Sequence, residues 1–324
     1  MRESLLFRYS MKFRVIILII ITDWDKEALQ FYLNNRAWYS EEKRCWGLNP
    51  LKYSTVVLDL DGTLLNSKKE VSKRNLDAVL SCYLKGMRII FATARPPRAV
   101  NWFLPQELLD IGAFVYYNGA QVICKETKIE INESIPANVT TEILDYCLKC
   151  NPEIELTMEV RDEWFSLREL DYITSMNTRS NPIVKPLKEL KQYDATKILL
   201  SGNNDSSGLL KKFEGKVNIL ITDNHQLIQI MPLLASKELA ITKLCELYNV
   251  ELDSVIVFGD DHNDLGLFKK AGYAIAMGNA IKELKEIADE ITANNDENGV
   301  AVSLERFCGS RRLFERQDGA KGFG

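Results

Sequence analysis

Short apolar runs alternate with longer amphipathic stretches along the chain from about residue 51 onward. The run YSTVVLDL is rich in β-branched residues and leads directly into the turn residues DGT, which is typical of a buried strand. MRIIFAT and AFVYYNGA predict two further strands, and helices are expected between them, one capped by Ser72 and ending at Leu84 and one over Ala99–Leu108. This alternation predicts a parallel sheet that is covered by helices on both faces.

The same rhythm returns late in the chain, with a helix expected over Lys237–Tyr248, the strand SVIVFGD, a helix over Leu265–Lys270 and the strand YAIAM. Between these halves the pattern changes. EIELTMEV and EWFSLREL predict a hairpin, and KILLSG and VNILIT predict strands beside polar helical stretches. We therefore expect an α/β fold with a parallel-sheet core over residues 51–132 and 226–308 and an inserted α+β domain over 133–225.

The two ends of the chain have a different character. Residues 1–50 carry several basic residues before the apolar run Val15–Ile21, which is much shorter than the roughly 20 residues that span a bilayer. This segment is compatible with a weak signal or anchor, with a surplus extension or with an extra strand and helix; we favour a dispensable extension, and we expect no stable membrane span. The polar, glycine-containing residues 309–324 predict a disordered tail.

Composition narrows the classes of function. The chain has 324 residues and is 46% hydrophobic and 27% charged, which suits a soluble protein of two domains. Its formal net charge of -4 argues against a nucleic-acid partner. Seven cysteines form no dense disulfide pattern, which indicates a reducing compartment and hence the cytoplasm. A single C-x-x-C, Cys147 and Cys150, lies far in sequence from His225 and His262, so no zinc site is predicted.

Polar residues directly follow each predicted core strand. Parallel α/β sheets bind ligands beyond the carboxyl ends of their strands, so these side chains should converge. They are Asp59, Asp61, Thr93, Arg95, Asn118, Gly119, Asp260, Asp261, Asn263 and Asp264. Carboxylates gathered at one edge repel one another unless a cation lies among them, and oxygen ligands select a hard ion such as Mg²⁺. A phosphate group could then be held by the metal, by the Thr93 hydroxyl, by backbone amides and by a lysine.

These segments resemble the motifs of the haloacid dehalogenase superfamily. VVLDLDGTLLNS is similar to its first motif, FATAR to its second, and VFGDDHNDLGLFKKAGYAIAMGNA to its fourth in the form of the Cof-type subfamily. YYNGA resembles the Asn-Gly turn of that subfamily, and Lys237 stands where the third-motif lysine is expected. The likeness runs from about Tyr53 to Phe307 and implies a Rossmann-like core with a cap domain inserted between the second and third motifs. Ala94 stands where relatives commonly have glycine.

The resemblance also implies roles for the strand-end residues. Asp59 would attack phosphorus to form an aspartyl-phosphate, and Asp61 would protonate the leaving oxygen and later activate water. Mg²⁺ would be bound by Asp59, by the backbone carbonyl of Asp61 and by Asp260. Thr93 and Lys237 would stabilise charge on the phosphoryl oxygens. The remaining members are Asn263 as a phosphate contact, Asp264 as the residue that orients Lys237, and Arg95, Asn118 and Gly119 on the substrate side.

The expected function is a Mg²⁺-dependent phosphatase that acts on a small phosphorylated metabolite, a sugar phosphate or a phosphorylated cofactor. A phosphomutase of the same superfamily and a phosphate-binding regulatory module without turnover are the alternatives, and no feature decides the oligomeric state. Lys197 is a second candidate for the third-motif lysine, although it lies inside the insert. A calcium loop at Asp59 is disfavoured because Leu64 replaces the required glycine and a strand precedes the loop. Cap residues that could face the substrate are Glu159, Arg161, Trp164 and Arg168.

Overall fold

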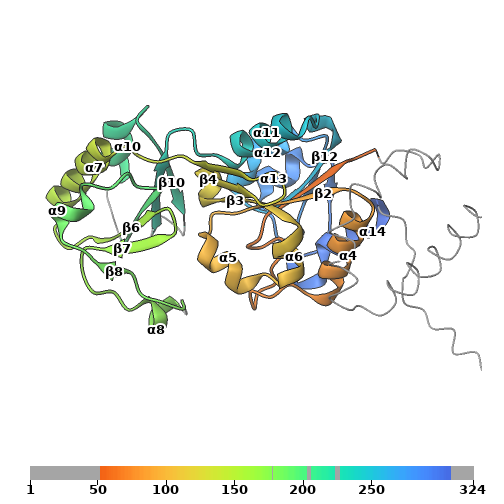
Figure 1. Ribbon diagram of the computed structural model, residues 1–324, viewed down its shortest axis with the longest axis horizontal. Coiled ribbons are helices and arrows are strands. Elements are labelled where there is room, and N and C mark those ends of the chain that lie inside the picture. Colours follow the sequence, from red (N-terminus) through yellow and green to blue (C-terminus); the bar gives the residue numbers. More distant parts are fainter. Residues whose placement is uncertain (1–51, 177, 203–205, 223–226, 308–324) are drawn as a thin grey trace, which may run out of the picture. The chain divides into compact units, whose positions relative to one another are not determined.

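The computed structural model describes residues 52–176, 178–202, 206–222 and 227–307 (Figure 1). The predictions for residues 1–50 and 309–324 concern parts of the chain outside these ranges. No helix in the described part is both long enough and apolar enough to cross a bilayer.

A mostly parallel sheet forms the core. In the described chain it has eight strands in the order β14-β13-β12-β1-β2-β3-β4-β5, and the first six of these neighbours run parallel. The parallel strands are β1 (Thr55–Leu58), β2 (Arg88–Ala92), β3 (Gly112–Tyr116), β12 (Val255–Gly259), β13 (Tyr273–Ala276) and β14 (Glu290–Ile291). Every residue of β1 and β12 is buried, as expected for strands covered on both faces. The expected α/β core is confirmed.

Two antiparallel strands extend this sheet beyond β3, which the sequence pattern did not predict. They are β4 (Gln121–Cys124) and β5 (Ile129–Asn132). The chain reverses between β3 and β4 through η1 (Tyr117–Gly119), where all three residues have positive φ angles of 52°, 55° and 108°. This turn is the Asn-Gly segment singled out in the sequence, and the reversal puts Asn118 at the end of β3.

Helices cover the core sheet on both faces (Figure 1). On one side α4 (Lys73–Leu84) packs with α6 (Gln106–Ile111) and α14 (Gly299–Phe307), and on the other α11 (Lys237–Tyr248) packs with α12 (Leu265–Phe268), followed by α13 (Lys282–Ile287). Ser72 accepts the N–H of Asn75 as the predicted cap of α4. The single helix expected over Ala99–Leu108 is wrong. It is two helices, α5 (Pro97–Phe103) and α6, because Pro105 lacks an N–H and its ring excludes a continuous helix.

The inserted cap is an α+β domain with its own sheet, in the order β10-β11-β9-β6-β7-β8. Its strands are β6 (Glu155–Val160), β7 (Glu163–Ser166), β8 (Ile183–Val184), β9 (Lys197–Ser201), β10 (Val217–Thr222) and β11 (Leu227–Pro232). Its helices are α7 (Ala137–Cys150), α8 (Tyr172–Met176), α9 (Leu187–Leu190) and α10 (Ser206–Phe213). The predicted β6–β7 hairpin is present.

The cap extends further along the chain than the sequence suggested. Strand β11 lies between β9 and β10 and is antiparallel to both, so residues 227–232 belong to the cap sheet and the start of the second core segment at residue 226 is wrong. Ile228 and Ile230 of β11 are buried in the apolar core of the cap, together with Leu144 and Phe213. Burial of these side chains accounts for the position of β11. A strand with alternating apolar residues is stabilised wherever one of its faces is buried, and here that face is buried in the cap.

Candidate active site

The candidate residues lie at one edge of the core sheet. Asp59 follows β1, Thr93 follows β2, and Asp260 follows β12, and these three strands are neighbours with the same direction. The backbone ladder continues to the first polar residues, since the N–H of Asp59 donates to Phe258 O at 3.2 Å and that of Thr93 to Val115 O at 2.8 Å. The hydrogen bonds of the sheet therefore fix the backbone positions of Asp59 and Thr93.

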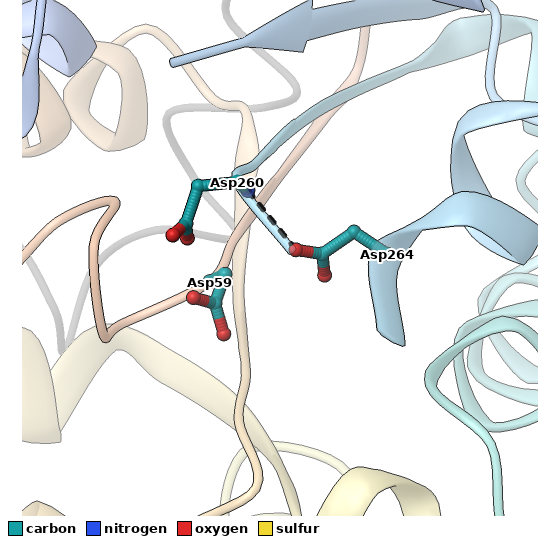
Figure 2. A group of neighbouring side chains, drawn as sticks. All are labelled: Asp59, Asp260 and Asp264. Atoms are coloured by element: carbon teal, nitrogen blue, oxygen red, sulfur yellow. Dashed lines mark hydrogen bonds between the residues drawn. The ribbon is translucent and has the colours of Figure 1, made fainter. Parts of the chain in front are cut away.

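Three carboxylates gather at this edge. One oxygen from each of Asp59, Asp260 and Asp264 lies within 4.8 Å of the others (Figure 2). Lys237, the first residue of α11, is 1% exposed, and its side chain contacts this group of carboxylates. Its Nζ donates to Asp59 Oδ1 at 2.6 Å and to Asp264 Oδ1 at 2.8 Å. Of the two candidate lysines, the structure places Lys237, and not Lys197, against Asp59.

Asp264 organises the loop that follows β12. While its Oδ1 accepts from Lys237, its Oδ2 accepts the N–H groups of Asp260 at 3.1 Å and Asp261 at 3.4 Å, the first of which is drawn in Figure 2. Asp260 in turn accepts the hydroxyl hydrogen of Thr63 at 2.9 Å. The DGT loop thus packs directly on Asp260, and a Cβ added at Gly62 would lie 2.1 Å from Asp260 Oδ2. Glycine at position 62 permits this approach and the φ of +74°.

The charge of the group is unbalanced, with three carboxylates around one ammonium. Burial raises the pKa of Asp59 well above its usual range, although Lys237 opposes the shift. Burial, with repulsion from Asp264, raises the pKa of Asp260 to about 6 despite the Thr63 hydroxyl. Burial works against the charge of Lys237, but Asp264 and Asp59 outweigh it and raise the pKa of that lysine. An oxygen-only donor set with surplus negative charge fits a hard divalent cation such as Mg²⁺.

Asp61 lies outside the carboxylate group. Its side chain accepts two hydrogen bonds from Arg95, from Nε at 2.5 Å and from Nη2 at 2.8 Å, and one from Lys69 Nζ at 2.7 Å. Partial burial would raise the pKa of Asp61, but the hydrogen bonds and charges of Arg95 and Lys69 outweigh it, and the pKa is lowered. The structure therefore favours the carboxylate form of Asp61 while Arg95 contacts it.

The polar residues after β2 and β3 form one connected group. The Asn118 N–H donates to Thr93 O at 2.9 Å, Thr93 Oγ1 accepts the Arg95 N–H at 3.1 Å, and Asn263 Nδ2 donates to Asn118 Oδ1 at 3.0 Å. Asn263 Oδ1 is buried without a hydrogen-bond partner among the described residues. A buried acceptor of this kind is costly unless a ligand or water reaches it.

Gly119 and Ala94 have local backbone explanations. Gly119 has a φ of +108°, and a Cβ there would lie 2.3 Å from Ser236 O, so glycine lets the η1 turn pack against the start of α11. In the structure its visible role is packing beside the site. Ala94 is not among the described residues with positive φ, so this backbone does not require the glycine that relatives commonly have there.

The cap contacts the core at the loops that carry these residues. The guanidinium of Arg98, at the start of α5, donates to both oxygens of Glu159 in β6 at 2.6 and 2.7 Å. Tyr117 Oη donates to Arg161 O at 2.7 Å, and Lys197 Nζ donates to Ala94 O at 3.3 Å. Arg98 and Tyr117 were missed in the sequence, where nothing distinguishes them from ordinary surface or core residues.

The four cap candidates divide into two groups. Glu159, Arg161 and Trp164 lie on the side of the cap that contacts the core, and the Trp164 ring lies 5.2 Å from the guanidinium of Arg98. Arg168 instead pairs with Glu153, whose side chain is 84% exposed, so it belongs to the outer surface of the cap. Of the four candidates, the first three therefore lie on the side of the cap that contacts the core, and Arg168 does not.

A parallel α/β sheet with an inserted cap, and carboxylates gathered with a lysine at the strand ends, define an α/β enzyme with an acidic active site. The family model of haloacid dehalogenase-like hydrolases matches residues 56–304, and the chain belongs to this family.

Individual relatives agree with this assignment. The chain is 28% identical over 261 residues to the 5-amino-6-(5-phospho-D-ribitylamino)uracil phosphatase YitU of Bacillus subtilis, a match that covers 78% of this chain and 96% of YitU. The crystal structure of TM0651 from Thermotoga maritima is similar with a TM-score of 0.71 and 28% identity, over 78% of this chain and 97% of that one. A haloacid dehalogenase-like hydrolase from Bacteroides thetaiotaomicron has a TM-score of 0.66 and 30% identity, over 78% and 99%. The chain is thus an enzyme of the phosphatase class.

Proposed function

We propose that this protein is a Mg²⁺-dependent phosphatase that hydrolyses a small phosphorylated metabolite through an aspartyl-phosphate on Asp59. The observation that carries the proposal is the position of Asp59. Its carboxylate lies at the end of β1, 2.6 Å from Lys237 Nζ and beside Asp260 and Asp264. A nucleophile, a cation and metal-binding oxygens therefore meet at one point of the sheet edge.

Asp59, Asp260 and the backbone carbonyl of Asp61 are the groups that would hold Mg²⁺. Bound there, the ion would supply the positive charge that the surplus carboxylates and a substrate phosphate both need. Asp264 is less suited to bind the ion, because Lys237 and two backbone N–H groups already occupy its oxygens. Its role in the proposal is to hold Lys237 and the loop after β12 in place.

The reaction runs in two displacements. Lys237 holds Asp59 Oδ1, and the other oxygen attacks phosphorus as the bond to the leaving oxygen breaks. Asp61 gives its proton to that leaving oxygen. Water then attacks the phosphorus of the aspartyl-phosphate, Asp61 takes a proton from this water, and inorganic phosphate leaves as the Asp59 carboxylate is restored. Thr93 and Lys237 donate to the phosphoryl oxygens in both steps.

Arg95 connects substrate binding to the protonation of Asp61. Its guanidinium, which now pairs with Asp61, turns to the substrate phosphate, for which its planar donors are also suited. Loss of these two hydrogen bonds raises the pKa of Asp61 and lets it carry the proton for the first step. Asn118 and Asn263 face the same phosphate.

The names of two relatives support a proposal for the substrate class. YitU and YwtE of Bacillus subtilis are both named for the phosphatase reaction on 5-amino-6-(5-phospho-D-ribitylamino)uracil, which carries its phosphate on a sugar alcohol. We place this chain's substrate in the wider group of sugar and sugar-alcohol phosphates. The activity is assigned to the cytoplasm, in keeping with free cysteines at positions 82, 124, 147, 150 and 245.

Phosphate release from a panel of such metabolites, with Mg²⁺, tests the proposal. We expect turnover by the native chain, loss of turnover after chelation and its recovery on adding Mg²⁺. Asp59→Asn should lower kcat by about 10⁴-fold or more. Asp110→Asn in α6, an exposed aspartate that accepts from Gln106, is the matched control and should keep native activity. Full activity in Asp59→Asn would reject the mechanism, and product without free phosphate would indicate a mutase instead.

A further inference from the structure

Lys197 is a buried charge that the proposed reaction does not use. It is the first residue of β9 in the cap and is 6% exposed. Among the described residues its ammonium makes one hydrogen bond, to Ala94 O at 3.3 Å, although it has three N–H groups to donate. Burial accordingly lowers the pKa of Lys197 to about 8, with only partial opposition from Glu159. An ammonium buried with so little compensation is costly, which points to a purpose other than stability.

The nearest carboxylate does not balance this charge. Glu159 lies directly opposite Lys197 in the β6–β9 ladder, so both side chains leave the same face of the cap sheet. Both oxygens of Glu159, however, accept from Arg98 of the core. Glu159 is thus committed to the contact between cap and core, while two N–H groups of Lys197 have no acceptor in the described part of the chain.

The face that carries Lys197 is turned toward the candidate active site. Side chains from three neighbouring strands on this face contact three site loops. Lys197 contacts Ala94, which lies between Thr93 and Arg95, Glu159 contacts Arg98, and Met231 of β11 accepts from Asn118 Nδ2 at 3.7 Å. The opposite side chains of the same strands, such as Ile198 and Ile230, fill the cap's own core.

Other polar groups lie on the same face. Thr157 and Gln229 are both buried and stand opposite Leu199 from the two neighbouring strands. Trp164 stands opposite Glu159, and its buried Nε1 has no hydrogen-bond partner among the described residues. Within the described chain, Trp164 Nε1 is thus a further donor on this face without an acceptor, beside two N–H groups of Lys197. It is independent evidence that a ligand with several oxygens accepts hydrogen bonds from this face.

We infer that Lys197 is a specificity-determining residue that donates to a hydroxyl oxygen on the leaving group of a sugar or sugar-alcohol phosphate. This inference rests on the proposed phosphatase function. A hydroxyl suits the place better than an anion does, because it can accept a hydrogen bond from Lys197 and donate one to Ala94 O at the same time. A carboxylate or a second phosphate could also accept from Lys197, but it has no hydrogen to donate to Ala94 O.

The test compares substrates with and without hydroxyl groups. The probes are phenyl phosphate and the best polyol phosphate among ribose 5-phosphate, glycerol 3-phosphate and mannitol 1-phosphate, each assayed with Mg²⁺. Lys197→Met removes the donor and keeps an unbranched chain of similar length. We expect it to lower the ratio of kcat/KM for the polyol phosphate over phenyl phosphate by about 10-fold or more. Lys211→Met, at an exposed lysine on α10 of the cap, is the matched control and should leave the ratio unchanged.

Each other outcome decides against the inference. An equal fall for both substrates would mean that Lys197 only joins cap to core, and an unchanged ratio would mean that it does not contact the leaving group. A thermal melt of Lys197→Met separates these results from misfolding. If the native chain releases no phosphate from any probe, the proposed function itself fails, and this inference with it. Native turnover with unaltered discrimination rejects Lys197 alone.

Discussion

Lys237 in the core and Lys197 in the cap are both buried beside the site loops, but their ammonium groups are compensated very differently. Lys237 donates to two carboxylates at 2.6 and 2.8 Å, and its pKa is raised. Within the described ranges Lys197 donates to one carbonyl, Ala94 O at 3.3 Å, and its pKa is lowered to about 8. The core therefore holds the Lys237 ammonium in position before substrate binds, as electrostatic catalysis requires. The Lys197 ammonium in the cap instead keeps hydrogen-bonding capacity that a bound substrate can use.

Removing Lys237 tests the compensated side of this comparison and should give the largest effect on stability. Lys237→Met leaves Asp59 and Asp264 buried without their cation. In the absence of divalent metal we expect a loss of about 3–5 kcal/mol in the free energy of unfolding at neutral pH. Urea denaturation of the full chain measures it. A variant as stable as the native protein would show that Lys237 does not balance these carboxylates.

Removing Lys197 should change the free energy of unfolding in the opposite direction. A lysine whose pKa is about 8 in the folded protein and 10.5 in the unfolded chain costs stability below pH 8, and this cost disappears as the pH rises to 10.5. Lys197→Met should therefore stabilise the protein at pH 7, on the order of 1–3 kcal/mol. Unfolding at pH 7 and at pH 10 checks the sign and the trend. Destabilisation at pH 7 would contradict the contrast between the two lysines.

The ion pair between cap and core offers a third test, with a smaller expected change in stability. The Glu159 side chain is 4% exposed and pairs with Arg98. Glu159→Gln removes the negative charge of this pair and should destabilise the protein by about 1–2 kcal/mol. Glu153→Gln alters the pair with Arg168, where the Glu153 side chain is 84% exposed, and should change stability by less than about 0.5 kcal/mol. Equal effects in thermal unfolding would show that the contact with Arg98 contributes no more than a surface ion pair.

Much of the core could be predicted because its signals are local. The strands before Asp59, Thr93 and Asp260 are short apolar runs that end in polar residues, and parallel strands bring their ends to one edge. The helix break at Pro105 was also readable in principle, since proline excludes a continuous helix. The antiparallel strands β4 and β5 were not predicted, because their pairing depends on the positive φ angles in the preceding turn.

The cap and its contacts were harder to predict because they depend on long-range pairing. Strand β11 has the same apolar alternation as a core strand, and only its partners β9 and β10 assign it to the cap. The ion pair of Arg98 with Glu159 joins residues 61 positions apart. One signal was present in the sequence. A lysine that opens the apolar run KILL is out of place in a buried strand, and this marks Lys197 as a residue to examine.

The central claim is that the Asp59 carboxylate captures the phosphoryl group, and mass spectrometry of the acid-quenched protein tests it most directly. Asp61→Asn should be mixed with phenyl phosphate and Mg²⁺, because this ester depends less on a proton donor, while hydrolysis of the intermediate still needs Asp61. We predict that the peptide containing Asp59 gains the mass of one phosphoryl group and that Asp59→Asn shows no such gain. An unmodified peptide, together with native turnover in Asp59→Asn, would contradict the account.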